Sequence, residues 1–399
     1  MRLLLVNQPS PVFGGSETYL LTITTELERF GHDVAIYAPA GGPAESVARE
    51  RGFQVVSDSD ALPAAPDAVI TQDAESCVEM AGRYPHAARV YVSHSGPYVP
   101  QIPPHVSGSY QAVVAMNDGT ERHGHAISTG PRVLRLRQPV DLERFCGRGE
   151  PRPQLERLLL FGNQRNSQAH SAQLVAAACD RLGIELVRVG DDRHSLAPEM
   201  AIAEADAVVG IGRCIVEAMA CQRPAFVLGE TGAAGWVTPA NYEMIEGRAF
   251  TCGETSMGLD VEGLCRELGR YRPEMGRHNR ELALAQHSNR QHVSLLVAMI
   301  EELQPRPVAE PGALEAVARA VRVQRELMQR IGLAEGELRW LRDRNRGLET
   351  EHQRLERDNK AMRREIDAIL AGRRYRIAQR LGRPIDAIRA RLGNHRDRP

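Results

Sequence analysis

The chain has 399 residues, of which 42% are hydrophobic and 25% are charged, and its formal net charge is −1. This composition is typical of a folded protein with two or three domains, and it excludes a collagen, a disulfide-stabilised miniprotein and a fully disordered chain. The charge is unevenly distributed, because residues 1–300 carry a net −8 and residues 301–399 a net +7. Lys360 is the only lysine, so a clamp for phosphate groups must be built from arginine or backbone amides.

The seven cysteines show no CxxC spacing, which indicates reduced thiols and neither a disulfide framework nor a zinc site. The first apolar run has only four residues, which is too short for a signal peptide, and no stretch approaches the roughly 18–20 apolar residues of a membrane span. These features predict a cytoplasmic protein.

Two series of short apolar runs alternate with helical patterns, as in βαβ units. The first series predicts a helix that stops at Gly31 and strands over 3–6, 34–37, 55–56, 68–70, 89–92 and 113–115. The second predicts strands over 158–161, 185–189, 207–209 and 225–228, with helices over 170–182, 198–204 and 215–221. A run rich in glycine, proline and charge at 147–153 separates them. We therefore predict an α/β protein with two Rossmann-like parallel-sheet domains, 1–147 and 148–300, that face a crevice.

The sequence changes character after a proline-rich linker at 301–312. Over 313–370, apolar residues occupy every d position of a heptad repeat, at Leu327, Ala334, Leu341, Leu348, Leu355, Met362 and Ile369. Asn345 and Asn359 at a positions favour a parallel, in-register homodimer through residues 324–370. The alternative is a single long helix packed on the chain's own globular part.

Residues 371–399 form a basic tail with nine arginines and two aspartates. Its apolar residues recur at near-helical spacing, which fits an amphipathic segment on an anionic membrane surface, peripheral at the inner face. A solvated basic tail is the alternative. We do not expect nucleic-acid binding, because the tail has one aromatic residue and no known motif.

Three groups of residues point to chemistry at the crevice. Gly14 and Gly15 follow the first strand and open a helix, so their amides can approach an anion. Gly212 and Arg213 lie on a glycine-rich strand-to-helix turn, with Glu217 one helical turn further on. His94 stands at the end of a strand and precedes Gly96-Pro97. This strand-end position projects the histidine from the sheet edge into the crevice.

In combination these residues resemble the GT-B glycosyltransferases of family 4. The strongest carrier is 217–224, which is similar to the family's E-A-M-A-x-G-x-P run. Residues 14–17 with 31–34 look like the G-G-x-E and G-H-x-V opening, and 138–145 resembles the end of the family's N-terminal domain. The resemblance covers about residues 1–300. It implies a retaining, metal-independent hexosyltransferase without a cofactor, which uses a nucleotide-sugar donor to build cell-surface polysaccharide or glycoconjugate on a glycan or lipid-linked acceptor.

The resemblance also implies roles for individual residues. Gly14 and Gly15 would face the donor diphosphate, and Arg165 would stand where the family has a basic phosphate-binding residue. The predicted catalytic residues are His94, which would contact the donor sugar and help position the acceptor, and Glu217, which would hold the donor ribose. The remaining substrate-binding residues are Gly162, Gly212, Arg213 and Gly232, and no metal ligand is expected.

Two departures from the family keep other functions open. Val209 stands where the family has its first conserved-motif Glu, and 231–239 looks like a compact version of the family's glycine loop. The missing carboxylate suggests, as an alternative, a non-catalytic nucleotide-sugar-binding scaffold that assembles through its coiled coil. A sugar-nucleotide epimerase is a third hypothesis, and it would need an acid/base pair of which only His94 is evident.

Overall fold

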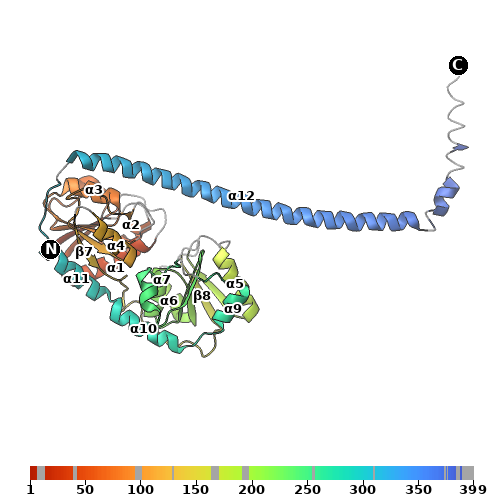
Figure 1. Cartoon of the computed structure of the whole chain (residues 1–399), viewed down its shortest axis with the longest axis horizontal. Coiled ribbons are helices and arrows are strands. Elements are labelled where there is room, and N and C mark those ends of the chain that lie inside the picture. Colours follow the sequence, from red (N-terminus) through yellow and green to blue (C-terminus); the bar gives the residue numbers. More distant parts are fainter. Residues whose placement is uncertain are drawn as a thin grey trace, which may run out of the picture. The chain divides into compact units, whose positions relative to one another are not determined.

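The computed structural model describes residues 1–6, 14–38, 43–94, 101–127, 130–162, 170–190, 197–253, 257–308, 311–372, 374, 376–382 and 387–388. These residues form two compact units, Met1–Gln324 and Arg325–Pro399. The first unit contains two α/β lobes, which confirms the predicted fold class, and the second continues a long helix (Figure 1).

The first lobe is built on a seven-stranded parallel sheet in the order β3-β2-β1-β4-β5-β6-β7. Its strands are β1 (Arg2–Val6), β2 (Asp33–Tyr37), β3 (Gln54–Val56), β4 (Ala68–Thr71), β5 (Ala88–Ser93), β6 (Ala112–Ala115) and β7 (Arg132–Arg135). Its helices are α1 (Gly15–Arg29), α2 (Pro43–Glu50), α3 (Ala74–Arg83), α4 (Asp118–Ala126) and the short η1 (Ser59–Ala61). All six predicted strands are present. The sequence missed β7, because this edge strand is short and only partly buried.

The second lobe has five strands in the order β12-β11-β10-β8-β9. They are β8 (Arg157–Phe161), β9 (Glu185–Val189), β10 (Ala207–Gly210), β11 (Ala225–Gly229) and β12 (Gly232–Trp236). The helices are α5 (His170–Leu182), α6 (Pro198–Glu204), α7 (Arg213–Ala220), α8 (Tyr242–Gly247), α9 (Val261–Leu268) and α10 (Glu274–Gln286).

Strand β12 is a difference from the sequence-based interpretation, which placed a glycine loop at 231–239. It pairs antiparallel to β11. Trp236 explains the strand, because its ring packs edge-on against Phe226 at 5.1 Å and its indole N–H donates to the Glu267 carbonyl. The backbone is extended where this side chain is buried at the sheet edge. Residues 232–236 of the glycine-rich stretch therefore form the second strand of a hairpin and not a loop.

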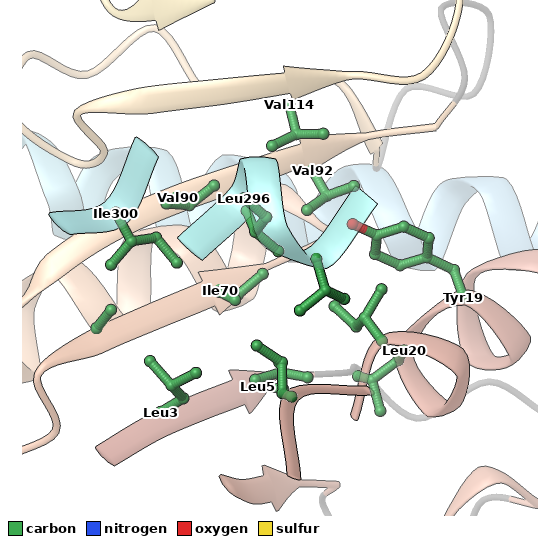
Figure 2. Packing of buried hydrophobic residues seen from close by; sticks show 14 of the residues in the cluster. Leu3, Leu5, Tyr19, Leu20, Ile70, Val90, Val92, Val114, Leu296 and Ile300 are labelled. Atoms are coloured by element: carbon green, nitrogen blue, oxygen red, sulfur yellow. The ribbon is translucent and has the colours of Figure 1, made fainter. Parts of the chain in front are cut away.

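Helix α11 (Asn289–Glu302) returns the chain to the first lobe. Its Leu296 and Ile300 pack in the core of that lobe with Leu3, Ile70 and Val90 (Figure 2). By packing, α11 therefore belongs to the first lobe, although all but its last two residues fall within the range 148–300 assigned to the second. The lobes are joined by two crossing segments, one before Val140 and one at His287, which run side by side.

Helix α12 (Pro311–Ala371) confirms the long C-terminal helix. In the first unit, Leu314 packs against Val78 and Ala81 of α3, and Arg322 pairs with Glu75 at 3.1 Å. In the second unit, the apolar heptad residues lie open, as at Leu341 and Leu355, which are 48% and 56% exposed. Pairing of this helix with another copy stays a prediction. Within the described part of the chain, no helix combines the length and apolarity needed to cross a membrane.

Gln222 has a left-handed backbone conformation that favours glycine, so a substitution here can measure the cost of this strain. It has φ +60° and closes α7, where Arg223 N–H donates to the Ala218 carbonyl and Gln222 N–H to that of Met219. This Schellman geometry favours glycine, which the similar family motif carries here. We expect Gln222→Gly to raise the free energy of unfolding by about 0.5–1 kcal/mol. Urea denaturation measures the change. Gln222→Ala is the control, because it retains the β-carbon and should bring no gain.

Candidate active site

A cleft of about 990 Å³ lies between the two lobes of the first unit. The first lobe lines it with the start of α1, His94 after β5, and the residues around the start of α4. The second lobe contributes the start of α7 and the segment from Met244 to Gly253 that includes the end of α8. The predicted residues Gly15, His94, Gly212 and Arg213 therefore meet at one site. They meet because each follows the carboxyl end of a parallel strand.

Two helix N-termini face this cleft. Helix α1 begins at Gly15 after the N-cap Gly14, and helix α7 begins at Arg213 after the N-cap Gly212. Gly212 has φ +69° and donates its N–H to the Phe250 carbonyl at 2.8 Å. With no side chain, Gly212 cannot cap α7 itself. The positive ends of both helix dipoles therefore point to a region suited to an anion.

Arg213 connects the two lobes at the cleft. Its Nε donates to Glu217 Oε1 at 2.8 Å in its own helix, and its Nη2 donates to Thr22 Oγ1 at 2.8 Å on α1. Among the described residues, its buried Nη1 has no hydrogen-bond partner. A buried, unpaired donor on a charged group is costly, so an anionic ligand entering the cleft would satisfy it.

Glu217 lies behind Arg213 and does not itself line the cleft. It is 4% exposed, and burial raises its pKa while the charge of Arg213 opposes the rise. The pair is thus a buried ion pair in which Glu217 orients the guanidinium. The partner of Glu217 is thus Arg213, another residue that the sequence analysis assigned to the site.

His94 is held in place by neutral groups. Its Nε2 lies 2.6 Å from Gln72 Oε1, and its carbonyl accepts a hydrogen bond from Asn117 Nδ2 at 3.1 Å. The Tyr19 ring packs edge-on against the imidazole with 4.8 Å between centroids. Burial, followed by the charge of Arg213, lowers the pKa of His94 to about 3. The imidazole is therefore neutral at physiological pH and suited to hydrogen bonding.

The other predicted residues are distributed more widely. Gly162 follows β8 directly and donates its N–H to the Val189 carbonyl, and Gly232 begins β12. Neither lines the cleft as the structure describes it. Arg165 lies outside the described residues.

Sequence reasoning missed the segment after α8, which forms much of the second wall. Ala249 and Phe250 have φ +55° and +54° and both line the cleft. Left-handed backbone is usually signalled by glycine or asparagine, and neither residue type stands here. Asn117 was also missed, although an asparagine directly after an apolar strand and before a helix is a recognisable N-cap signal.

No group of three or more histidine, cysteine, aspartate or glutamate side chains is arranged to hold a metal ion among the residues that the structure describes. Metal-independent chemistry stays a prediction.

The two lobes, their sheet orders and the cleft between them define the GT-B fold. Comparison with solved structures finds HepE from Anabaena in complex with UDP at a TM-score of 0.53, with 14% identity over 76% of this chain and 100% of that one. A glycosyltransferase from Rickettsia africae matches at a TM-score of 0.50, with 11% identity over 75% of this chain and 98% of that one. The pneumococcal O-GlcNAc transferase GtfA, in complex with UDP and GlcNAc, matches at a TM-score of 0.51, with 10% identity over 76% of this chain and 99% of that one. No family model and no curated protein matches the chain.

Proposed function

We propose that the chain is a glycosyltransferase that moves a sugar from a nucleotide-sugar donor to a glycan, lipid-linked or other acceptor. The observation that carries the proposal is Arg213, which lines the cleft of a GT-B fold at the start of α7 and whose buried Nη1 has no hydrogen-bond partner among the described residues. A guanidinium at a helix N-terminus suits a diphosphate. HepE and GtfA share this fold, and their structures contain UDP. This likeness supports a nucleotide as the ligand of the cleft.

The proposed transfer breaks the bond between the sugar and the nucleoside diphosphate. Negative charge develops on the leaving diphosphate, and the Arg213 guanidinium with the amides near Gly15 and Gly212 would stabilise it in the transition state. Neutral His94 would hydrogen-bond the donor sugar. We further propose retention of configuration, metal-independent chemistry, action at the cytoplasmic side, and a role in cell-surface polysaccharide or glycoconjugate synthesis. In this proposal Gly162, Arg165 and Gly232 keep the donor-side roles that the family resemblance implies. Glu217 would act on the donor through Arg213 instead of holding the ribose itself. Gly14 would shape the start of α1, because its N–H donates to Glu17 Oε2 at 2.9 Å and is not available to a diphosphate.

A specific observation favours the alternative of a non-catalytic scaffold. Val209 is fully buried in the apolar cluster of the second lobe. The side chain at this position thus offers neither a carboxylate nor access to the cleft. A chain that binds the donor through phosphate contacts alone could then lack transferase activity.

A donor panel separates the two functions. Thermal-shift measurements with UDP, GDP, ADP and TDP and their common sugars should identify the nucleotide, and release of that nucleotide measures turnover. Turnover that depends on an acceptor supports transfer. Stabilisation by a nucleotide sugar without turnover supports the scaffold, whereas interconversion of the donor without acceptor would favour an epimerase.

The exposed heptad face of α12 leads us to propose a parallel homodimer. Sedimentation equilibrium of the full chain should give twice the monomer mass. Substituting aspartate at both Leu341 and Leu355 should yield a monomer, because charge at d positions cannot be buried in the seam. The control Gln353→Glu changes an exposed b position, which points away from the seam, and should leave the dimer intact. A monomeric wild-type chain would contradict the prediction.

The basic tail at 371–399 lies largely outside the described residues, and we propose that it binds an anionic membrane surface. Deleting 371–399 should weaken binding to phosphatidylserine vesicles while leaving donor binding unchanged. Cosedimentation at increasing salt measures the electrostatic part of the interaction. Equal binding with and without the tail would contradict the prediction.

A further inference from the structure

The two segments that connect the lobes are hydrogen-bonded to each other. Val140 N–H donates to the His287 carbonyl at 2.9 Å, and Asn289 N–H donates to the Val140 carbonyl at 3.3 Å. The first segment follows β7, and the second joins α10 of the second lobe to α11 of the first. Any rotation of one lobe against the other must bend both segments, so groups that hold them also hold the angle between the lobes.

Two histidines bind consecutive carbonyls of the first crossing segment in the same way. His287 Nδ1 lies 2.7 Å from the Gln138 carbonyl, and His292 Nδ1 lies 3.1 Å from the Arg137 carbonyl. A carbonyl only accepts, so Nδ1 carries the proton in both rings and Nε2 is left as an acceptor. Both side chains are buried, and burial lowers the pKa of each to about 4. Both imidazoles are therefore neutral bridges at physiological pH.

Each free Nε2 accepts a hydrogen bond from a tyrosine, and the two tyrosines come from opposite lobes. Tyr19 of α1 lies 3.0 Å from His292 Nε2, and Tyr242 of α8 lies 2.9 Å from His287 Nε2. Both hydroxyls are held in apolar surroundings, where burial raises the tyrosine pKa values and keeps the hydroxyls as donors. Figure 2 shows Tyr19 beside α11, among the core residues of the first lobe.

Both tyrosines belong to elements that line the cleft. Tyr19 lies one turn after Ser16 and packs against His94. Tyr242 opens α8, whose Glu246 lines the opposite wall. Arg135 of β7 holds Glu246 through two hydrogen bonds of 2.9 and 2.8 Å, which ties α8 to the first lobe. Each wall of the cleft is thus connected through one imidazole to one of two consecutive carbonyls in the first crossing segment, the first lobe to that of Arg137 and the second lobe to that of Gln138.

We propose that Tyr19 and Tyr242 are positioning residues, whose hydrogen bonds to His292 and His287 set the angle between the lobes and the placement of His94. The kinetic part of this inference rests on the proposed transferase function. The part that concerns the crossing segments does not.

Hydrogen–deuterium exchange on the full chain tests the inference without any assay of activity. Tyr19→Phe and Tyr242→Phe each remove one hydroxyl and keep the ring, which leaves a buried Nε2 unsatisfied. We expect exchange in peptides that cover 136–140 and 286–293 to become ~10-fold faster in either variant. UDP should slow exchange in these peptides less in the variants than in the wild type.

Two other buried tyrosine hydrogen bonds provide matched controls. Tyr84 donates to the Pro63 carbonyl and Tyr271 to the Arg152 carbonyl, each at 2.8 Å and neither at a crossing segment. Tyr84→Phe and Tyr271→Phe should leave exchange at the crossing segments unchanged. Crossing-segment exchange that is unaltered by Tyr19→Phe and Tyr242→Phe, or raised equally by the controls, would overturn the proposal.

Kinetics then test the placement of His94. In an active chain, Tyr19→Phe should lower kcat/KM by ~3- to 10-fold while Tyr84→Phe leaves it unchanged. An equal effect of both variants would contradict a positioning role for Tyr19. An inactive wild-type chain would count against the proposed function, and the exchange experiment would still decide the role of the tyrosines at the crossing segments.

Discussion

Arg213→Met should lower sugar transfer by ~10²- to 10³-fold, the usual cost of removing one preorganised charge-stabilising donor. Among the described residues, Arg213 is the only arginine that lines the cleft and has a buried nitrogen without a hydrogen-bond partner. The substitution removes this group. Nucleotide binding should weaken as well, because the diphosphate is charged before the reaction. Nucleotide release measures the first effect, and a thermal-shift titration with UDP measures the second.

Loss of Arg213 also leaves Glu217 buried without its counter-charge, so the single variant could fail by unfolding. Removing one partner of a buried pair typically costs about 3–5 kcal/mol. The double variant Arg213→Met with Glu217→Gln removes both charges, and it should recover most of the stability while transfer stays lost. Arg213→Lys should be inactive too, because one ammonium group cannot reach Glu217, Thr22 and a phosphate together. Wild-type turnover in the double variant would exclude Arg213 from the mechanism.

The strands could be predicted from the sequence because parallel strands buried on both faces appear as continuous apolar runs. Once the strands were placed, residues that follow their carboxyl ends, such as His94 and Arg213, could be assigned to a crevice, because ligands of parallel sheets bind at that edge. The partners of these residues could not be predicted. Thr22 reaches Arg213 only because the lobes lie together, and Gln72 reaches His94 across the sheet from the preceding strand.

The second wall of the cleft was beyond sequence reasoning for a different reason. Ala249 and Phe250 adopt left-handed backbone that neither residue type favours. The surrounding hydrogen bonds impose it, as Phe250 N–H donates to the Ile245 carbonyl while the Phe250 carbonyl accepts from Gly212. Such strain is stored where tertiary contacts over-determine the backbone.

The near-absence of lysine also has a structural counterpart in two buried arginines. Arg89 and Arg223 are 3% and 2% exposed, and among the described residues neither forms an ion pair. Arg89 donates to the carbonyls of Tyr84, Ala87, Gly108, Ser109 and Arg306. Arg223 donates to those of Arg148, Gly149, Ala203, Cys221 and Gln222. Each arginine thereby holds one of the two segments that the sequence marked as linkers, near 149 and near 306.

Arg223→Met should therefore lower the free energy of unfolding of the second lobe by about 3–5 kcal/mol, because several buried carbonyls lose their hydrogen-bond donor at once. Trp236 is buried in that lobe, so its fluorescence during urea unfolding reports the loss, with Trp340→Phe removing the other tryptophan. Arg223→Lys should recover little, since a single ammonium group cannot span carbonyls on three segments. The control is Arg270→Met, which removes an exposed pair with Glu267 and should cost less than about 1 kcal/mol. Equal losses for Arg223→Met and Arg270→Met would show that the carbonyl contacts of Arg223 do not stabilise the lobe. A large loss in both Arg223→Met and Arg223→Lys would show that the planar guanidinium holds a linker in place where a lysine could not.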